Sequence, residues 1–218
     1  MKKYLILLGI FLANIIFASS AVATIIDGSV TGGTSLSQGG TFVNLGFAPS
    51  GLAVGNDTIQ NPNLYGFNED QNILLTADLS IDVGGSTIAS GTEVASHYVF
   101  FDPDLATTIT GWVDFDSEIL GIITSTSNLL ASDFLLNNGV TYLNPSFRGL
   151  EAGQDMASID STYANRLNIS FYASSPGDYI RVLTAHSDGA INVPEPASIA
   201  LLGLGLVGLG FSRRRKQV

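Results

Sequence analysis

Two groups of carboxylates have a spacing that could support chemistry in this chain. Asp102 and Asp104 stand two residues apart, and Asp114, Asp116 and Glu118 continue the same spacing further along. If each segment is extended, alternate residues project from one face, so each group presents its acids together. Clustered carboxylate oxygens are the ligands that Ca²⁺ takes, about 6 to 8 of them around the ion. We therefore treat these five acids as candidate calcium ligands.

Two other interpretations of the same acids stay open. They can form the solvated acidic face of a strand. Alternatively, two of them can act as the carboxylate pair of a glycoside hydrolase, which needs a defined separation and one raised pKa. Neither group contains the D-x-D-x-D-G loop of an EF-hand. The spacing alone does not choose among the three.

Trp112, the only tryptophan, is the candidate contact for a ligand. An exposed aromatic ring on a β-sheet offers a flat apolar surface against which a sugar ring can stack. In a regular strand, Trp112 and Phe115 lie on opposite faces, so one of the two faces is the less buried one. The alternative is that both faces are covered and Trp112 belongs to the core.

No constellation of residues points to catalysis. His97 and His186 are the only histidines, and no G-x-S-x-G nucleophile elbow is present. Without cysteine, two histidines make a zinc site improbable, because acids would have to complete it. No glycine-rich loop precedes a helix or a lysine as a phosphate site requires. We expect structural histidines and a protein that is not an enzyme, with Ca²⁺ as its only candidate cofactor.

The central part of the chain is strongly acidic. The whole chain has nine basic and 19 acidic residues, but between Thr24 and Asn192 only three arginines face 18 acids. Such a surface repels nucleic acid, which we exclude as a partner. No cysteine is present, so an exported domain here depends on its apolar core without disulfides. A span of this length fits one domain.

The elements that must position these side chains are predominantly predicted strands. The residues 75–83 alternate apolar and polar without a fault, which indicates a strand with one buried face. Further segments rich in β-branched and aromatic residues are 94–101, 109–115, 140–143, 167–173 and 179–185. Turn residues at 176–178 predict an antiparallel hairpin between the last two strands.

Little else in the central region has a regular pattern. Only residues 127–136 look helical, with Ser127 as N-cap. The glycine- and serine-rich stretch 24–72 predicts one or two edge strands among long loops. Many short strands with glycine-rich turns favour an all-β fold, an antiparallel β-sandwich of which the jelly roll is one form.

The N-terminal segment has the pattern of a secretory signal peptide. Lys2 and Lys3 precede an apolar run to Phe17, and Ala21 and Ala23 form an A-x-A cleavage site for signal peptidase. The mature chain is then expected to start near Thr24. The expected organisation is a cleavable signal at 1–23, a β-sandwich ectodomain at 24–191 and a separate C-terminal segment at 192–218.

The C-terminal segment has three parts in a fixed order. A box of four residues is followed by an apolar run from 197 to 211 and then by a basic cluster. As a helix, the apolar run would reach about 22 Å, short of the ~30 Å hydrocarbon core. The residues of the box and the cluster are Val193, Pro194, Glu195, Pro196, Arg213, Arg214 and Arg215.

This segment resembles the PEP-CTERM sorting signal of Gram-negative bacteria. In that family, the Pro-Glu-Pro box precedes a short transmembrane helix and an arginine-rich end, and a membrane-embedded exosortase reads the box. A second resemblance, to an uncharacterised group of PEP-CTERM cargo domains for which no reaction is known, rests on residues 96–104, 111–118, 149–151, Asp155 and 176–184. The resemblance implies an inner-membrane intermediate and then the cell surface, the outer envelope or the extracellular matrix.

These features together predict an exported, sorted protein with a structural or interaction role linked to extracellular polysaccharide. Its expected partners are signal peptidase, an exosortase, the inner membrane during export, and that polysaccharide. The alternative is a glycan-binding module that uses calcium or aromatic residues. A carbohydrate-active enzyme is the third hypothesis.

Overall fold

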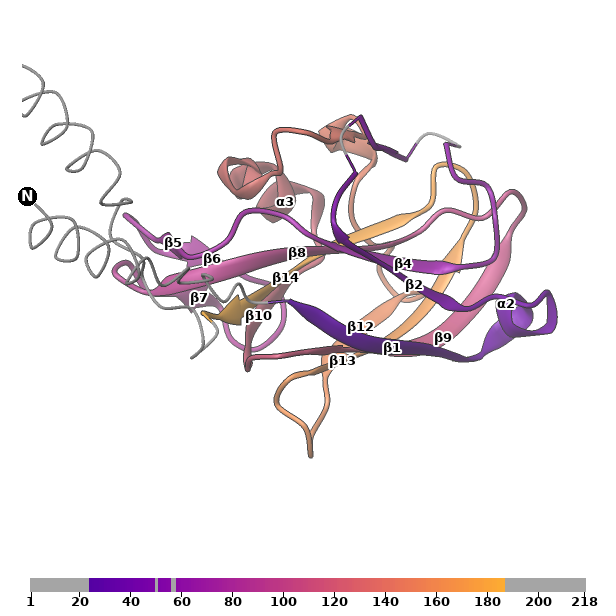
Figure 1. Cartoon of the computed structure of the whole chain (residues 1–218), viewed down its shortest axis with the longest axis horizontal. Coiled ribbons are helices and arrows are strands. Elements are labelled where there is room, and N and C mark those ends of the chain that lie inside the picture. The colour runs from indigo at the N-terminus through magenta and orange to yellow at the C-terminus, as the bar shows by residue number, and fades with distance from the viewer. Residues whose placement is uncertain (1–23, 50, 56–57, 187–218) are drawn as a thin grey trace, which may run out of the picture. The chain divides into compact units, whose positions relative to one another are not determined.

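Two β-sheets face each other across an apolar core, which confirms the predicted all-β sandwich (Figure 1). The structure is a computed structural model that describes residues 24–49, 51–55 and 58–186. The predicted signal peptide at 1–23 and the sorting segment at 192–218 lie outside the described residues. No helix in the described part of the chain is long and apolar enough to cross a membrane.

The smaller sheet has the order β1-β9-β13-β12, and every pair in it is antiparallel. Along β9, buried residues alternate with exposed or half-buried ones, as in a strand with one wet face. The same alternation runs along β13. The four strands are β1 (Ile25–Gly32), β9 (Thr107–Phe115), β12 (Met156–Ile159) and β13 (Arg166–Ala173).

The larger sheet has the order β10-β14-β8-β4-β2, with β5 pairing beside β8. Its central strands are buried along almost their whole length, because both faces of this sheet are covered. The pair β2 and β4 is parallel, whereas the other pairs are antiparallel. The strands are β2 (Phe42–Phe47), β4 (Leu64–Asn68), β5 (Ile73–Leu74), β8 (Glu93–Phe101), β10 (Ile119–Ile123) and β14 (Asp178–Ala185).

The core between the sheets is built from the inward residues of both. Val99 and Phe101 of β8 and Ile180 of β14 face Ile109 and Val113 of β9 across it. Burying side chains of this size contributes about 1.5–3 kcal/mol each. Without disulfides, this burial is the main term that holds the two sheets together.

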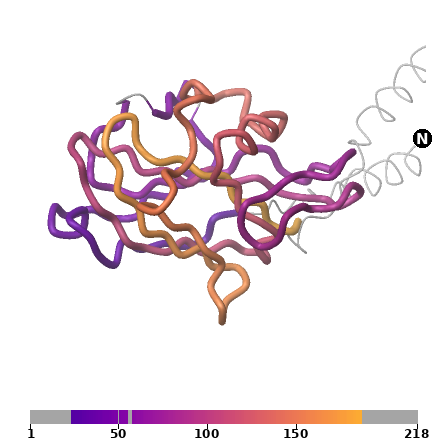
Figure 2. The backbone as a smooth tube through the Cα atoms, turned by 180° about the vertical axis from the view of Figure 1, so that it is seen from behind, coloured from indigo at the N-terminus to yellow at the C-terminus, as the bar shows by residue number. Residues whose placement is uncertain are grey.

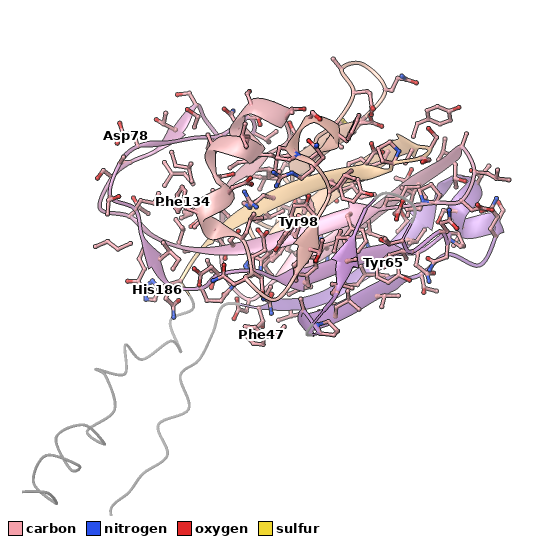
Figure 3. The ribbon with its side chains drawn as sticks, turned by 90° about the horizontal axis from the view of Figure 1, so that it is seen from above. Phe47, Tyr65, Asp78, Tyr98, Phe134 and His186 are labelled. Atoms are coloured by element: carbon pink, nitrogen blue, oxygen red, sulfur yellow. The ribbon has the colours of Figure 1, made fainter. Side chains whose placement is uncertain are left out.

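Short elements cover the other face of the larger sheet. At one end, α3 (Thr126–Ala131), η1 (Asp133–Leu135), β6 (Leu79–Ser80) and β7 (Thr87–Ile88) pack over a second apolar cluster. At the other end, β3 (Ala53–Val54), β11 (Thr141–Tyr142) and nearby loops cover an aromatic cluster. Viewed from the α3 side, Tyr98 lies over the middle of the sheet, and Phe134 lies on the helical segment (Figure 3). Two further elements are α2 (Gly33–Ser37) and η2 (Pro145–Phe147).

A fully buried ion pair lies beneath α3. Arg181 Nε donates to Glu69 Oε2 at 2.6 Å, and both side chains are completely shielded from solvent. Arg181 Nη1 also donates to the carbonyl oxygens of Leu129 and Ser132, which end α3. Ser96 Oγ donates to the same Glu69 Oε2. The pair therefore joins β14, β8 and the chain after β4 to the C-terminal end of α3.

Three local predictions differ from the structure. The predicted hairpin is wrong, because β13 lies in the smaller sheet and β14 in the larger one, so the turn at 176–178 crosses between sheets. The alternating residues 75–83 hold only the two-residue strand β6 and a bridge at Val83. Leu75, Leu79 and Ile81 are nevertheless buried, whereas Ala77 is exposed. The stretch 24–72 contains the interior strand β4, which its scattered apolar residues did not reveal.

The predicted helix 127–136 is shorter and begins earlier. The structure has α3 with Ser125 as N-cap residue and then the 3₁₀ turn η1. Ser132 interrupts the segment, because its hydroxyl donates back to the carbonyl oxygens of Asn128 and Leu129.

We predict that replacing Arg181 with Met costs about 3–5 kcal/mol in free energy of unfolding, because it leaves the Glu69 carboxylate buried without its partner. Denaturant unfolding measures the loss. The matched control is Arg166→Met, which breaks a more exposed ion pair with Asp114 and is expected to cost much less. Equal decreases in the free energy of unfolding in the two variants would show that the buried ion pair contributes no more to stability than the more exposed one.

Candidate functional site

The solvent-facing side of the smaller sheet gathers polar and aromatic side chains from β9 and β13. Register pairs the outward residues of the two strands directly across the sheet. We call this surface the outer face; it is formed by Thr108, Thr110, Trp112, Asp114, Arg166, Asn168, Ser170 and Tyr172. Hydroxyl, amide and aromatic groups thus lie in two adjacent rows.

Arg166 organises one end of the outer face. Its Nε and Nη2 donate to the two carboxylate oxygens of Asp114 at 2.6 and 2.7 Å. Its guanidinium carbon also lies 4.1 Å from the ring centre of Trp112 and 4.9 Å from that of Tyr163, within the range of cation–π attraction. Trp112 is half-buried, and Arg166 covers one side of its ring. The predicted ligand residue is therefore part of a packed, partly exposed cluster.

The hairpin between β12 and β13 carries Tyr163 beside this cluster and protrudes from the sandwich (Figure 2). Asp160 Oδ1 accepts hydrogen bonds from the backbone N–H groups of Thr162 and Tyr163, and its Oδ2 accepts one from Asn168 Nδ2. These hydrogen bonds lower the pKa of Asp160. An aspartate that bonds its own turn in this way fixes the hairpin conformation, so the exposed Tyr163 is held in place.

The predicted calcium ligands at the end of β8 lie in two different environments. Asp102 is fully buried, and its Oδ2 accepts a hydrogen bond from the Ile59 N–H at 3.3 Å. Ile59 belongs to the aromatic cluster on the covered face of the larger sheet, so Asp102 points to that side. Asp104 is exposed to solvent. The two side chains do not share one face.

The three acids near the end of β9 are also dispersed. Asp114 is bound to Arg166, and Asp116 Oδ1 accepts a hydrogen bond from the Thr24 N–H at 3.0 Å. Glu118 is exposed. A nine-residue strand spans about 30 Å, and β9 separates these acids from those that follow β8. The structure does not bring the five predicted ligands together.

A different set of acids converges. Glu151, Asp155 and Asp178 each offer an oxygen, and these oxygens lie within 4.8 Å of one another. No other cluster of three metal-ligating side chains occurs among residues 24–49, 51–55 and 58–186. Asp178 lies more than 20 residues after Glu151 and Asp155 in the sequence. Sequence patterns relate only residues that are close along the chain, so they did not predict this group.

His97 is a structural residue in the core. Asn68 Oδ1 already accepts a hydrogen bond from the Ile25 N–H, so His97 Nδ1 donates to the same oxygen at 2.8 Å. Its Nε2 then accepts a hydrogen bond from Thr184 Oγ1 at 3.0 Å. The imidazole is thereby held as the neutral Nδ1–H tautomer, and burial lowers its pKa to about 3. It links β4, β8 and β14.

This pKa predicts acid sensitivity. Between about pH 6.5 and 3, His97 is protonated in the unfolded chain but neutral in the native state. The free energy of unfolding therefore falls as the pH falls, by about 1.4 kcal/mol per pH unit. Denaturant unfolding at several pH values measures the slope. His97→Gln replaces the titratable imidazole with a neutral amide that can still form hydrogen bonds, so its stability is expected to depend less steeply on pH. The difference between the two slopes separates the contribution of His97 from that of carboxylates titrating in the same pH range. Identical slopes would contradict the assignment.

A cavity of about 400 Å³ on the covered side of the larger sheet is lined by the paired strands β3 and β11 and by residues that follow them. Its lining is mostly apolar and includes Val54, Leu143 and Phe147. Among the described residues of that lining, the only titratable side chain is Tyr142, whose hydroxyl accepts a hydrogen bond from the Asn137 N–H. Burial raises the pKa of Tyr142. The residues of this lining that the structure describes thus include no group that could act as an acid or base at neutral pH.

Comparison with family models matches residues 192–216 to the PEP-CTERM protein-sorting motif. No curated protein and no solved structure matches the chain. The resemblance drawn from the Pro-Glu-Pro box, the apolar run and the arginine cluster is thus confirmed. The chain carries a PEP-CTERM sorting signal, which implies an exosortase as processing partner and export to the cell surface or the extracellular space.

Proposed function

We propose that the β-sandwich is a non-catalytic module of the cell envelope or extracellular matrix that binds extracellular polysaccharide through its outer face. The observation that supports this most directly is the composition of that face. Arg166 fixes Asp114, Trp112 and Tyr163 in one cluster, and Tyr172 stands exposed at the other end. Aromatic area beside fixed hydrogen-bond donors and acceptors is what a sugar chain requires of a binding surface.

The charge distribution favours a neutral glycan as the ligand. The outer face carries one acid and one base, which neutralise each other as the Asp114 and Arg166 pair. Elsewhere the described chain is strongly acidic, so an anionic polysaccharide would be repelled. Between the charged end and Tyr172, the face presents hydroxyl and amide groups, from Thr110, Asn168 and Ser170.

The sorting signal supports the location in which such binding would occur. Residues 192–216 direct export, and polysaccharide is encountered outside the membrane. No part of this proposal requires catalytic activity, because neither a packed surface cluster nor a sorting signal depends on turnover. A role in holding the protein within the extracellular polymer is consistent with both features.

We predict that Tyr163→Ala and Tyr172→Ala each weaken binding to a neutral glucan about tenfold, since a stacked aromatic ring contributes about 1–1.5 kcal/mol. Affinity electrophoresis of the full chain in mild detergent, through gels containing the glucan, measures retardation. The control is Phe134→Ala, which removes an exposed aromatic ring on η1, away from the outer face. Equal retardation of all variants, or none for the unaltered protein, would refute binding at this face.

Export has a separate test. Replacing Pro194, Glu195 and Pro196 with alanine removes the box that an exosortase reads, so the protein is expected to stay in the inner membrane with its C-terminal segment attached. Fractionation and the mass of the recovered chain measure this outcome. The control replaces three exposed residues on and beside β7, Ser86, Thr87 and Ala89, by glycine. Unchanged processing and destination in the box variant would overturn exosortase sorting.

A further inference from the structure

The three converging acids come from separate parts of the fold. Glu151 and Asp155 lie in the loop between η2 and β12, and Asp178 is the first residue of β14. Their nearest oxygens lie within 4.8 Å of one another. The group therefore stands where the 151–155 loop meets the end of the larger sheet.

Strand geometry places Asp178 in an unfavourable position. It lies on the same side of β14 as Ile180 and Val182, which belong to the core between the sheets. Asp178 is 1% exposed, and its Oδ2 has no hydrogen-bond partner. The preceding Gly177 has φ +90°, and a Cβ there would lie 2.6 Å from the Phe101 carbonyl oxygen. Only glycine fits this turn, so the direction in which Asp178 enters the strand is fixed.

Backbone hydrogen bonds orient Asp155. Its Oδ1 accepts from the Tyr172 N–H at 2.7 Å, and its Oδ2 accepts from the Glu151 N–H at 3.0 Å. Each oxygen keeps a lone pair, and such outer hydrogen bonds are what hold carboxylate ligands at metal sites. Glu151 is exposed, so the group has an open side through which an ion and its water can enter.

The chain supplies no positive charge for this group. Arg148, Arg166 and Arg181 are the only lysine or arginine residues between Thr24 and Asn192. Each is engaged elsewhere, with Asp133, Asp114 and Glu69 respectively. Burial, followed by the charges of Asp155 and Glu151, raises the pKa of Asp178 to about 8. Three neighbouring carboxylates therefore repel one another, and one of them is driven to hold a proton.

We propose that Glu151, Asp155 and Asp178 bind a calcium ion that ties the 151–155 loop to the start of β14. All three ligands are hard oxygens, and no histidine or cysteine belongs to the group, which disfavours zinc. Two of the three ligands, Glu151 and Asp155, lie on one loop, and Glu151 is exposed there. Such a ligand set suits Ca²⁺ better than the strict octahedron of Mg²⁺. Extracellular modules bind calcium with dissociation constants of about 0.1–1 mM. The site uses none of the outer-face side chains and meets that face only through the backbone N–H of Tyr172, which donates to Asp155.

The test uses the full chain in mild detergent, first stripped with a chelator and then titrated with CaCl₂ or MgCl₂ in separate samples. For the unaltered protein, the melting temperature is expected to rise by several degrees with Ca²⁺, and calorimetric titration should give a dissociation constant of about 0.1–1 mM. Glu151→Gln changes an exposed residue, so it should fold normally and bind at least tenfold more weakly.

Asp178→Asn is compared with the unaltered protein by melting temperature, without and with calcium. Without calcium, it replaces a buried carboxyl that holds a proton with a neutral amide of similar size, so it should not lower the melting temperature, whereas with calcium the variant should show no rise. The control is Asp104→Asn, which removes one exposed carboxylate outside the group and should behave as the unaltered protein does. If Asp178→Asn does not fold, Glu151→Gln against Asp104→Asn decides the matter.

Three results would overturn the proposal. The first is a melting temperature of the unaltered protein that does not respond to Ca²⁺. The second is an equal calcium affinity in Glu151→Gln and Asp104→Asn, which would indicate diffuse attraction to an acidic surface. The third is a response to Mg²⁺ as large as that to Ca²⁺. Retardation by the glucan is measured on the same samples, so that a failure of calcium binding can be distinguished from a failure of glycan binding.

Discussion

The buried ion pair between Arg181 and Glu69 holds α3 against the larger sheet, on the face that a simple two-sheet sandwich would leave uncovered. The larger sheet is covered on both faces, so polar groups at the end of α3 lie in the interior. Arg181 satisfies the carbonyl oxygens of Leu129 and Ser132 while it neutralises Glu69. A buried charge pair of this kind is tolerated only when its remaining hydrogen-bonding groups are also satisfied, and here α3 supplies those partners. The packing of α3 on the sheet and the buried ion pair therefore depend on each other.

Scarcity of positive charge organises the rest of the molecule. Three arginines face 18 acids in the central region, and each arginine serves a different structural purpose. Arg148 holds the η1 segment through Asp133, Arg166 arranges the outer face, and Arg181 lies beneath α3. Carboxylates left without a cation must be solvated, protonated or bound to an ion. Most lie at the surface, and the Asp178 group is where the fold gathers acids without a cation of its own.

Function in this protein divides between two separate regions. The sorting motif at 192–216 implies export, and it lies in sequence outside the residues that form the sandwich. The sandwich has a wet outer face on the smaller sheet, while the larger sheet is enclosed. Among the residues that the structure describes, only those of the smaller sheet leave a side open to a polymer, because α3, β6, β7, β3 and β11 cover the exterior of the larger sheet. This asymmetry between the sheets is what assigns the proposed binding to Tyr163, Tyr172 and their neighbours.

The sequence alone determined the sorting signal, the strand-rich character and several strand positions, including those around 94–101 and 109–115. These depend on local order: a motif of contiguous residues, or alternation within one strand. Only the tertiary structure decided that β13 and β14 lie in different sheets, that Asp102 turns away from Asp104, and that Asp178 meets Glu151 and Asp155. Each of these depends on which distant segments pack together, and pairing across 20 or more residues is set by burial of the whole core, which no local pattern records.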